Sequence, residues 1–86
     1  MSIETLPNVL VTEQDWVQVS TGKVLLYVNS GTVRLVFKDT KPDVTVGGMG
    51  IELNQTDAFE NGIGGTIWGR STVTGIGSIS VTSLEV

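Results

Sequence analysis

Carboxylates are the first candidates for chemistry in this chain, because its 86 residues include no histidine and no cysteine. That composition removes the commonest general base and metal ligand, and it excludes disulfides and thiolate metal sites. Asp39 and Asp43 share one loop, and Asp57 and Glu60 share another. Lys41 would repel a cation between the first two, and a glycosidase needs a deep cleft that so short a chain can hardly build. We expect no enzyme, no catalytic residue, no metal and no cofactor.

Two glycine-rich segments, 47–50 and 62–65, have the composition of phosphate-binding loops. Such a loop must lead directly into a helix N-terminus, and neither segment is followed by a helical pattern. We interpret both as turns, bulges or points where another part of the backbone comes close.

Aromatic residues offer a binding chemistry instead. Trp16 and Trp68 fall on the polar sides of their predicted strands, and Arg70 lies two residues after Trp68. An exposed Trp next to Arg can stack on a sugar ring or anchor a protein partner. Either Trp can equally fill the core, because a slip of one residue exchanges the two faces of a strand. Both interpretations stay open for Trp68, whereas a core position is favoured for Trp16.

The elements that position these residues are short strands. Turn signals recur about every ten residues without any helical period, which predicts an all-β fold: a small antiparallel β-sandwich or barrel of about seven to eight short strands. The apolar run 23–29 is expected as a central strand covered on both faces, with Leu25 and Tyr27 on its second face. If this chain does not cover that face, another subunit must. The candidate interface residues are therefore Trp68, Arg70, Trp16, Tyr27 and Leu25.

The turn residues also predict which strands pair. Thr21-Gly22 is expected to close a hairpin, and the strand 32–38 is expected beside 23–29. Residues 61–84 are expected as a second hairpin, with strands at 63–70 and 76–82 and with Ile79 and Val81 facing inward. Between these, a short strand is expected at 44–46, which the glycines of 47–50 interrupt.

Length and charge limit the partners. The chain is expected to form one domain over 1–86, with residues 1–7 as an extended N-terminal arm that leads to an edge strand at 8–12. Five basic against nine acidic residues give a formal charge of −4, which disfavours nucleic acid and anionic membrane surfaces. The start lacks the features of a signal peptide, and no apolar run approaches transmembrane length. Small β domains with thin cores often compensate by forming oligomers.

A series of short motifs between Asp15 and Val81 resembles small β-rich structural proteins of tailed bacteriophages. The motifs are Asp15-Trp16-Val17, the apolar strand 23–29, Asp39-Thr40-Lys41-Pro42, Gly50-Ile51-Glu52-Leu53, Ile67-Trp68-Gly69-Arg70-Ser71 and the final strand 77–81. The resemblance implies a virion protein, either a capsid decoration (cement) protein or a tail or fibre accessory protein. It further implies contacts with capsid or other virion proteins and homo-oligomers, trimers among them, and it carries over no binding residue. The alternative is a carbohydrate- or receptor-binding module of a phage tail or fibre, with Trp16, Tyr27 and Trp68 as stacking platforms.

Overall fold

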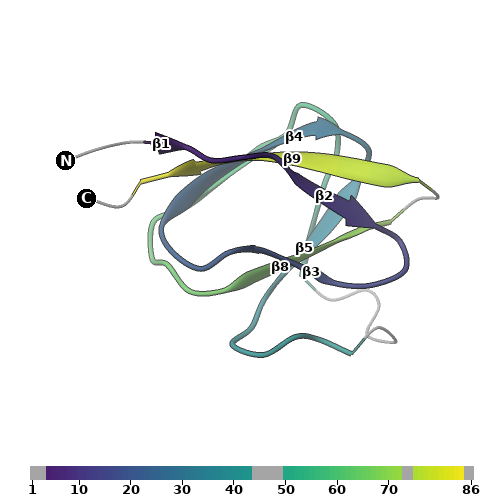
Figure 1. Ribbon diagram of the computed structural model, residues 1–86, viewed down its shortest axis with the longest axis horizontal. Coiled ribbons are helices and arrows are strands. Elements are labelled where there is room, and N and C mark those ends of the chain that lie inside the picture. The colour runs from purple at the N-terminus through teal and green to yellow at the C-terminus, as the bar shows by residue number, and fades with distance from the viewer. Residues whose placement is uncertain (1–3, 44–49, 73–74, 85–86) are drawn as a thin grey trace.

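The computed structural model describes residues 4–43, 50–72 and 75–84, and of Glu4 the backbone alone. These residues form strands and no helix, so none of them lies in a helix long and apolar enough to cross a membrane (Figure 1). The strands are β1 Glu4–Thr5, β2 Val9–Thr12, β3 Val17–Ser20, β4 Val24–Ser30, β5 Val33–Phe37, β6 Ile51–Leu53, β7 Ala58–Asn61, β8 Ile67–Ser71 and β9 Ile76–Ser83. The predicted all-β class is confirmed. The expected strand at 44–46 lies outside the described residues.

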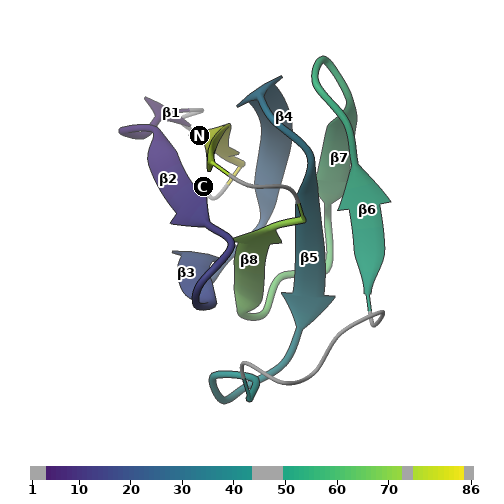
Figure 2. The ribbon, with the colours of Figure 1, turned by 90° about the vertical axis from the view of Figure 1, so that its right-hand side faces the viewer.

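Two antiparallel sheets face each other as a β-sandwich (Figure 2). Sheet A has the order β1–β9–β4–β7, and β2 also pairs with β9; sheet B has the order β3–β8–β5–β6. β1 and β2 follow the same strand, β9, and form one edge strand interrupted at Pro7, which has no backbone N–H. Counting them as one, the sandwich has eight strands, and the order in each sheet is that of a jelly roll.

The predicted hairpins are wrong. Thr21-Gly22 connects β3 of sheet B to β4 of sheet A, and β5 pairs with β8 and β6 rather than with β4. The stretch 61–84 likewise places β8 in sheet B and β9 in sheet A. Glycine and asparagine suit any tight reversal of the chain, so they mark crossings between sheets as readily as hairpins.

The strand expected at 63–70 begins later, at Ile67. The buried side chain of Asn61 holds the preceding residues in a loop: its amide nitrogen donates to the carbonyl of Gly64 at 3.1 Å. Its amide oxygen accepts from the backbone N–H groups of Ile63 and Gly64, both at 3.2 Å. Gly64 and Gly65 also have positive φ angles of 97° and 96°, which end a regular strand.

The core is a layer of aliphatic side chains between the sheets. Its fully buried members are Leu26, Leu35, Ile67, Ile79, Val11, Val28, Val33 and Val81. The inward positions expected for Ile79 and Val81 are therefore confirmed. In β4 burial alternates from residue 24 to residue 29, so Leu26 is fully buried while Leu25 and Tyr27 are exposed. The expectation that 23–29 is covered on both faces is wrong: no described part of the chain covers its outer side.

Two glycines let the sheets approach closely. A Cβ atom at Gly69 of β8 would lie 3.4 Å from Val11 Cγ1 of the opposite sheet, and also 2.8 Å from Val19 Cγ2 on the neighbouring strand β3. A Cβ atom at Gly77 of β9 would lie 2.8 Å from Val33 Cγ1 of the opposite sheet. A third glycine, Gly50, has φ of 84°, and a Cβ there would lie 1.9 Å from the carbonyl oxygen of Leu35. The close backbone approach expected at the glycines of 47–50 is thus found at Gly50.

We predict that Gly69→Ala lowers the free energy of unfolding by about 1–3 kcal/mol, because the added methyl group overpacks the layer between the sheets. Gly62→Ala is the matched control. A Cβ at Gly62 would meet nothing closer than 4.0 Å, from a Glu60 carboxylate oxygen. Urea unfolding of both variants measures the difference, and equal stabilities would contradict the close packing at Gly69.

Candidate interaction surfaces

The outer face of sheet B is polar and charged. Strand register places Gln18, Trp68 and Val36 in one row across β3, β8 and β5. The neighbouring row holds Arg70, Arg34 and Glu52, from β8, β5 and β6. The Arg34 guanidinium reaches the Glu52 carboxylate at 3.3 Å. Opposite charges across the strands thus partly offset the two arginines, which are direct cross-strand neighbours.

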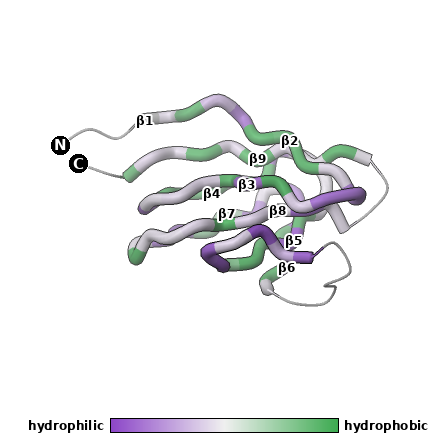
Figure 3. The backbone as a smooth tube through the Cα atoms, turned by 60° about the horizontal axis from the view of Figure 1, so that its bottom comes forward, coloured by the Kyte–Doolittle hydropathy of each residue, from purple (hydrophilic) through white to green (hydrophobic). Residues whose placement is uncertain are grey.

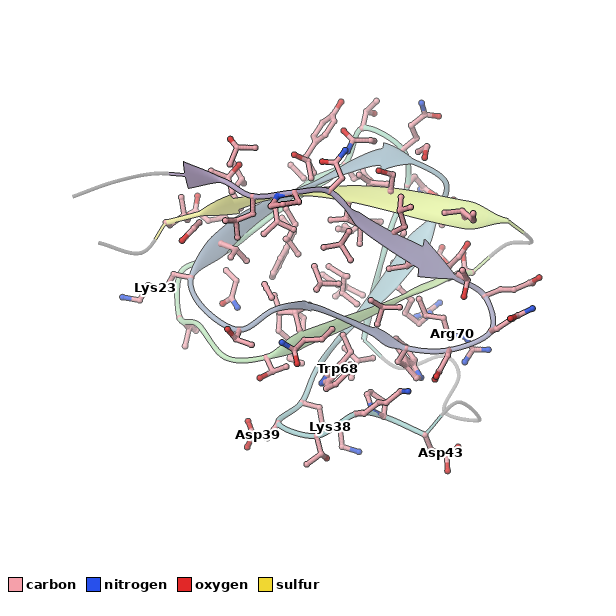
Figure 4. All side chains as sticks on the ribbon, viewed as in Figure 1. Lys23, Lys38, Asp39, Asp43, Trp68 and Arg70 are labelled. Carbon is pink, nitrogen blue, oxygen red and sulfur yellow. The ribbon has the colours of Figure 1, made fainter. Side chains whose placement is uncertain are left out.

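Two indole rings hold the loop 38–43 on this face. Trp68 Nε1 donates to the carbonyl of Lys38 at 3.0 Å, and Trp16 Nε1 donates to the carbonyl of Asp43 at 3.1 Å. Figure 4 shows Trp68 directed from the sheet toward Lys38. Under the loop, Val36 keeps only 5% of its surface exposed and Trp16 only 3%. The outer face of sheet B therefore has a small apolar cluster of its own.

Trp16 is buried on this outer face and is not part of the layer between the sheets. The guanidinium carbon of Arg70 lies 5.7 Å from the centroid of its ring, in the range of a cation–π contact. Arg70 Nε also donates to the carbonyl of Glu13 at 2.9 Å. These contacts fix Arg70 between the turn after β2 and the indole.

An ion pair ties the loop to the start of β3. Lys41 Nζ lies 2.7 Å from Asp15 Oδ2, and Asp15 Oδ1 accepts the backbone N–H of Trp16 at 2.8 Å. The hydrogen bond from Lys41, followed by that from the Trp16 N–H, lowers the pKa of Asp15 below its ordinary value of 3.8. Both side chains of the pair are about half exposed, so water weakens their attraction.

An open hollow of about 410 Å³ lies next to this cluster. It is lined by Glu13, Trp16, Arg34, Glu52, Arg70, Ser71 and Thr72. Guanidinium, carboxylate and hydroxyl groups meet there around one edge of an indole. Such a lining suits a polar ligand with hydroxyl or carboxylate groups, such as a sugar.

The outer face of sheet A differs in kind. Register places Thr82, Leu25 and Glu60 in one row across β9, β4 and β7, and Ser80, Tyr27 and Ala58 in the next. On the other side of β9, Leu10 of β2 pairs with Ser78 and Thr12 pairs with Ile76. The exposed fractions of the larger apolar side chains are 60% for Leu10, 38% for Leu25, 41% for Tyr27 and 61% for Ile76.

Charge is nearly absent from this surface, which we call the neutral face. Of the described side chains in these rows, Glu60 alone is charged, and it lies on the outermost strand, β7. Lys23 stands just before β4, at the end of the face, and points away from the sheet in Figure 4. The hydrophilic segments in Figure 3 include the turn after β2 and the loop after β5, which flank sheet B.

The five residues predicted as interface candidates therefore divide between two surfaces. Trp16, Trp68 and Arg70 lie on the outer face of sheet B, while Leu25 and Tyr27 lie on the neutral face. Sequence reasoning did not select Leu10 or Ile76 for the neutral face. Their positions beside buried Val11 and Gly77 carried the signal, since neighbours in a strand point to opposite faces.

Comparison with known proteins identifies no relative: no family model, no curated protein and no solved structure matches the chain.

We predict that Trp16→Phe destabilises the protein by about 1–3 kcal/mol, because the buried indole is made smaller and the partly buried Asp43 carbonyl loses its donor. Trp68→Phe is the matched comparison and should cost less, since water can replace the donor at its more exposed bond. Hydrogen exchange of the loop 38–43, measured together with thermal unfolding, reports both effects. Unchanged exchange in the Trp16 variant would contradict the anchoring of the loop.

The lowered pKa of Asp15 predicts an acid-dependent contribution to stability. Because the folded protein binds this proton less tightly than the unfolded chain, the contribution is present above the ordinary pKa of 3.8 and is lost as pH falls through the lower folded value. In a carbon-detected NMR titration, Lys41→Met should raise the pKa of Asp15 toward 3.8, whereas Lys38→Met should leave it unchanged. The same pKa in wild type and Lys41→Met would show that Lys41 is not the main cause.

Proposed function

We propose that this chain is a structural protein of a bacteriophage particle, namely a capsid decoration or stabilising protein that acts through subunit–subunit contacts. The observation that carries the proposal is the neutral face, where Leu10, Leu25, Tyr27 and Ile76 are exposed on one side of the sandwich. Large exposed apolar patches mark protein contact sites. The motifs between Asp15 and Val81 that resemble phage structural proteins supply the kind of particle.

The fold agrees with this proposal without deciding it. Double-sheet jelly rolls occur in viral capsid proteins, but they occur in lectins as well. A virion protein of this size would gain its binding strength from repetition: many weak contacts, multiplied by the symmetry of a capsid, give high avidity from low affinity per site. The proposal places the chain in the virion, with capsid proteins and further copies of itself as partners, and assigns it no catalytic activity.

The alternative, a carbohydrate- or receptor-binding module of a tail or fibre, is favoured by the hollow on sheet B. Two arginines, Arg34 and Arg70, line it together with hydroxyl and carboxylate groups. Of the three aromatic platforms expected from the sequence, Trp16 is only 3% exposed, and Arg70 lies over its ring. Stacking on a sugar would therefore fall to Tyr27 and Trp68, which lie on opposite sides of the sandwich.

We predict that the chain copurifies with phage particles. Particles from cultures that encode the chain should carry it through a density gradient at a fixed ratio to the major capsid protein, as measured by quantitative mass spectrometry. Free chain in the lysate and none in the particle band would overturn the proposal. A glycan array probed with the purified chain tests the alternative: glycan binding that Arg34→Ala abolishes, together with a copy number in the particle that follows a tail protein and not the major capsid protein, would favour the binding module.

A further inference from the structure

The neutral face is not flat, because small side chains on one strand lie between larger side chains on the neighbouring strands. β9 lies inside the sheet and begins with the exposed Ile76, but from Ser78 onward it presents only small hydroxyl side chains on this face: Ser78, Ser80 and Thr82. β4 on one side presents Leu25 and Tyr27 opposite Thr82 and Ser80, and β2 on the other presents Leu10 opposite Ser78. A low strip of these three residues, here called the hydroxyl strip, thus runs between Leu25 and Tyr27 on one side and Leu10 on the other.

We infer that a second copy of this chain covers the neutral face, with sheet A of one copy packed on sheet A of the other. A two-fold axis between the two sheets, directed along the line between β9 and β4, places β4 of each copy over β9 of its partner. Leu25 and Tyr27 of each copy then fill the space above the hydroxyl strip of the other. The same patch serves both copies, as closed two-fold symmetry requires. This inference rests on the proposed function in taking the neutral face as a contact surface, and it names the partner.

Charge favours this face as the place where two copies of the chain meet. Each copy carries a formal charge of −4, so copies repel one another through most of their surfaces. At the neutral face that repulsion is smallest, because Glu60 is on the outermost strand and no described charge lies in the middle. Packing there removes no described central charge from water, which would be costly. On the outer face of sheet B, the neighbouring Arg34 and Arg70 would instead meet their own copies.

The available area is sufficient for a weak, specific dimer. The eight residues of β9 give the face a length of about 26 Å, and four strands give it a width of about 19 Å. Each copy therefore offers roughly 500 Å², or about 1,000 Å² for the pair, which reaches the lower limit for specific interfaces. Tyr27 adds a phenolic hydroxyl that can pair with the serine and threonine hydroxyls of the strip.

Sedimentation velocity of the purified chain tests the association. The sedimentation coefficient should rise toward that of a dimer between about 1 µM and 1 mM. Leu25→Lys and Tyr27→Lys should each raise the dissociation constant at least about tenfold, since each substitution occurs twice in the interface. Ile63→Lys is the matched control: Ile63 is 93% exposed, but it lies in the loop between β7 and β8, away from the face. Its dissociation constant should equal that of the wild type.

A cross-linking experiment tests the geometry. The chain has no cysteine, so Ser80→Cys provides a single thiol in the hydroxyl strip. Facing sheets lie about 10 Å apart, so a bis-maleimide of about that span should trap a covalent dimer. Gly62→Cys, in the loop after β7, is the control and should remain monomeric under the same conditions.

Four results would overturn the inference. They are a monomer at every concentration, a dimer that Ile63→Lys weakens as much as the face variants do, a dimer that neither Leu25→Lys nor Tyr27→Lys weakens, and cross-linking through Gly62→Cys alone. A monomer whose binding to particles is lost in Tyr27→Lys would identify a different virion protein as the occupant of the neutral face.

The two proposals fail separately. A dimer that is absent from particles leaves the self-association standing and removes the virion role, while a monomer that is present in particles does the reverse.

Discussion

The packing of sheet A against sheet B through one layer of aliphatic side chains is the interaction on which the rest of this structure depends. Every described strand contributes to one of the two sheets, and Gly69 and Gly77 keep the layer thin where Val11 and Val33 of the opposite sheets face them. Burial of this layer supplies most of the free energy available to so short a chain. Because each sheet packs on this layer with one face only, its other face remains on the outside of the sandwich.

The two outer faces meet this constraint differently. Sheet B folds the loop 38–43 back over itself, and the indoles of Trp16 and Trp68 secure both ends of that loop. Sheet A receives no such cover from the described residues, and Leu25 and Tyr27 remain exposed there. Sheet B is thus covered in part by a loop of the same chain. Our proposals assign the cover of sheet A to another protein molecule.

The sequence predicts the all-β class and the inward faces of strands such as β9, because alternation is a property of neighbouring residues. It does not predict which strands pair. Gly22 and the turn at 29–31 reverse the chain between two sheets, yet the same residue types close hairpins, and the choice depends on where the partner strand lies. Trp16 is a second example of what the sequence does not predict. The alternation of its strand placed it on the polar side, but its burial there involves the loop that ends at Asp43, 27 residues away.

The position of β9 has a consequence for how the protein is made. β9 lies inside sheet A and pairs with β1, β2 and β4, while its predecessor β8 lies inside sheet B between β3 and β5. The strands synthesised earlier are thus left with gaps that only residues 67–83 can fill. Neither sheet closes until those residues are available, so folding depends on contacts between distant parts of the chain, which are slow to form. A chain that stops before β9 lacks the strand that joins β1 and β2 to β4, so the first two strands have no partner in sheet A.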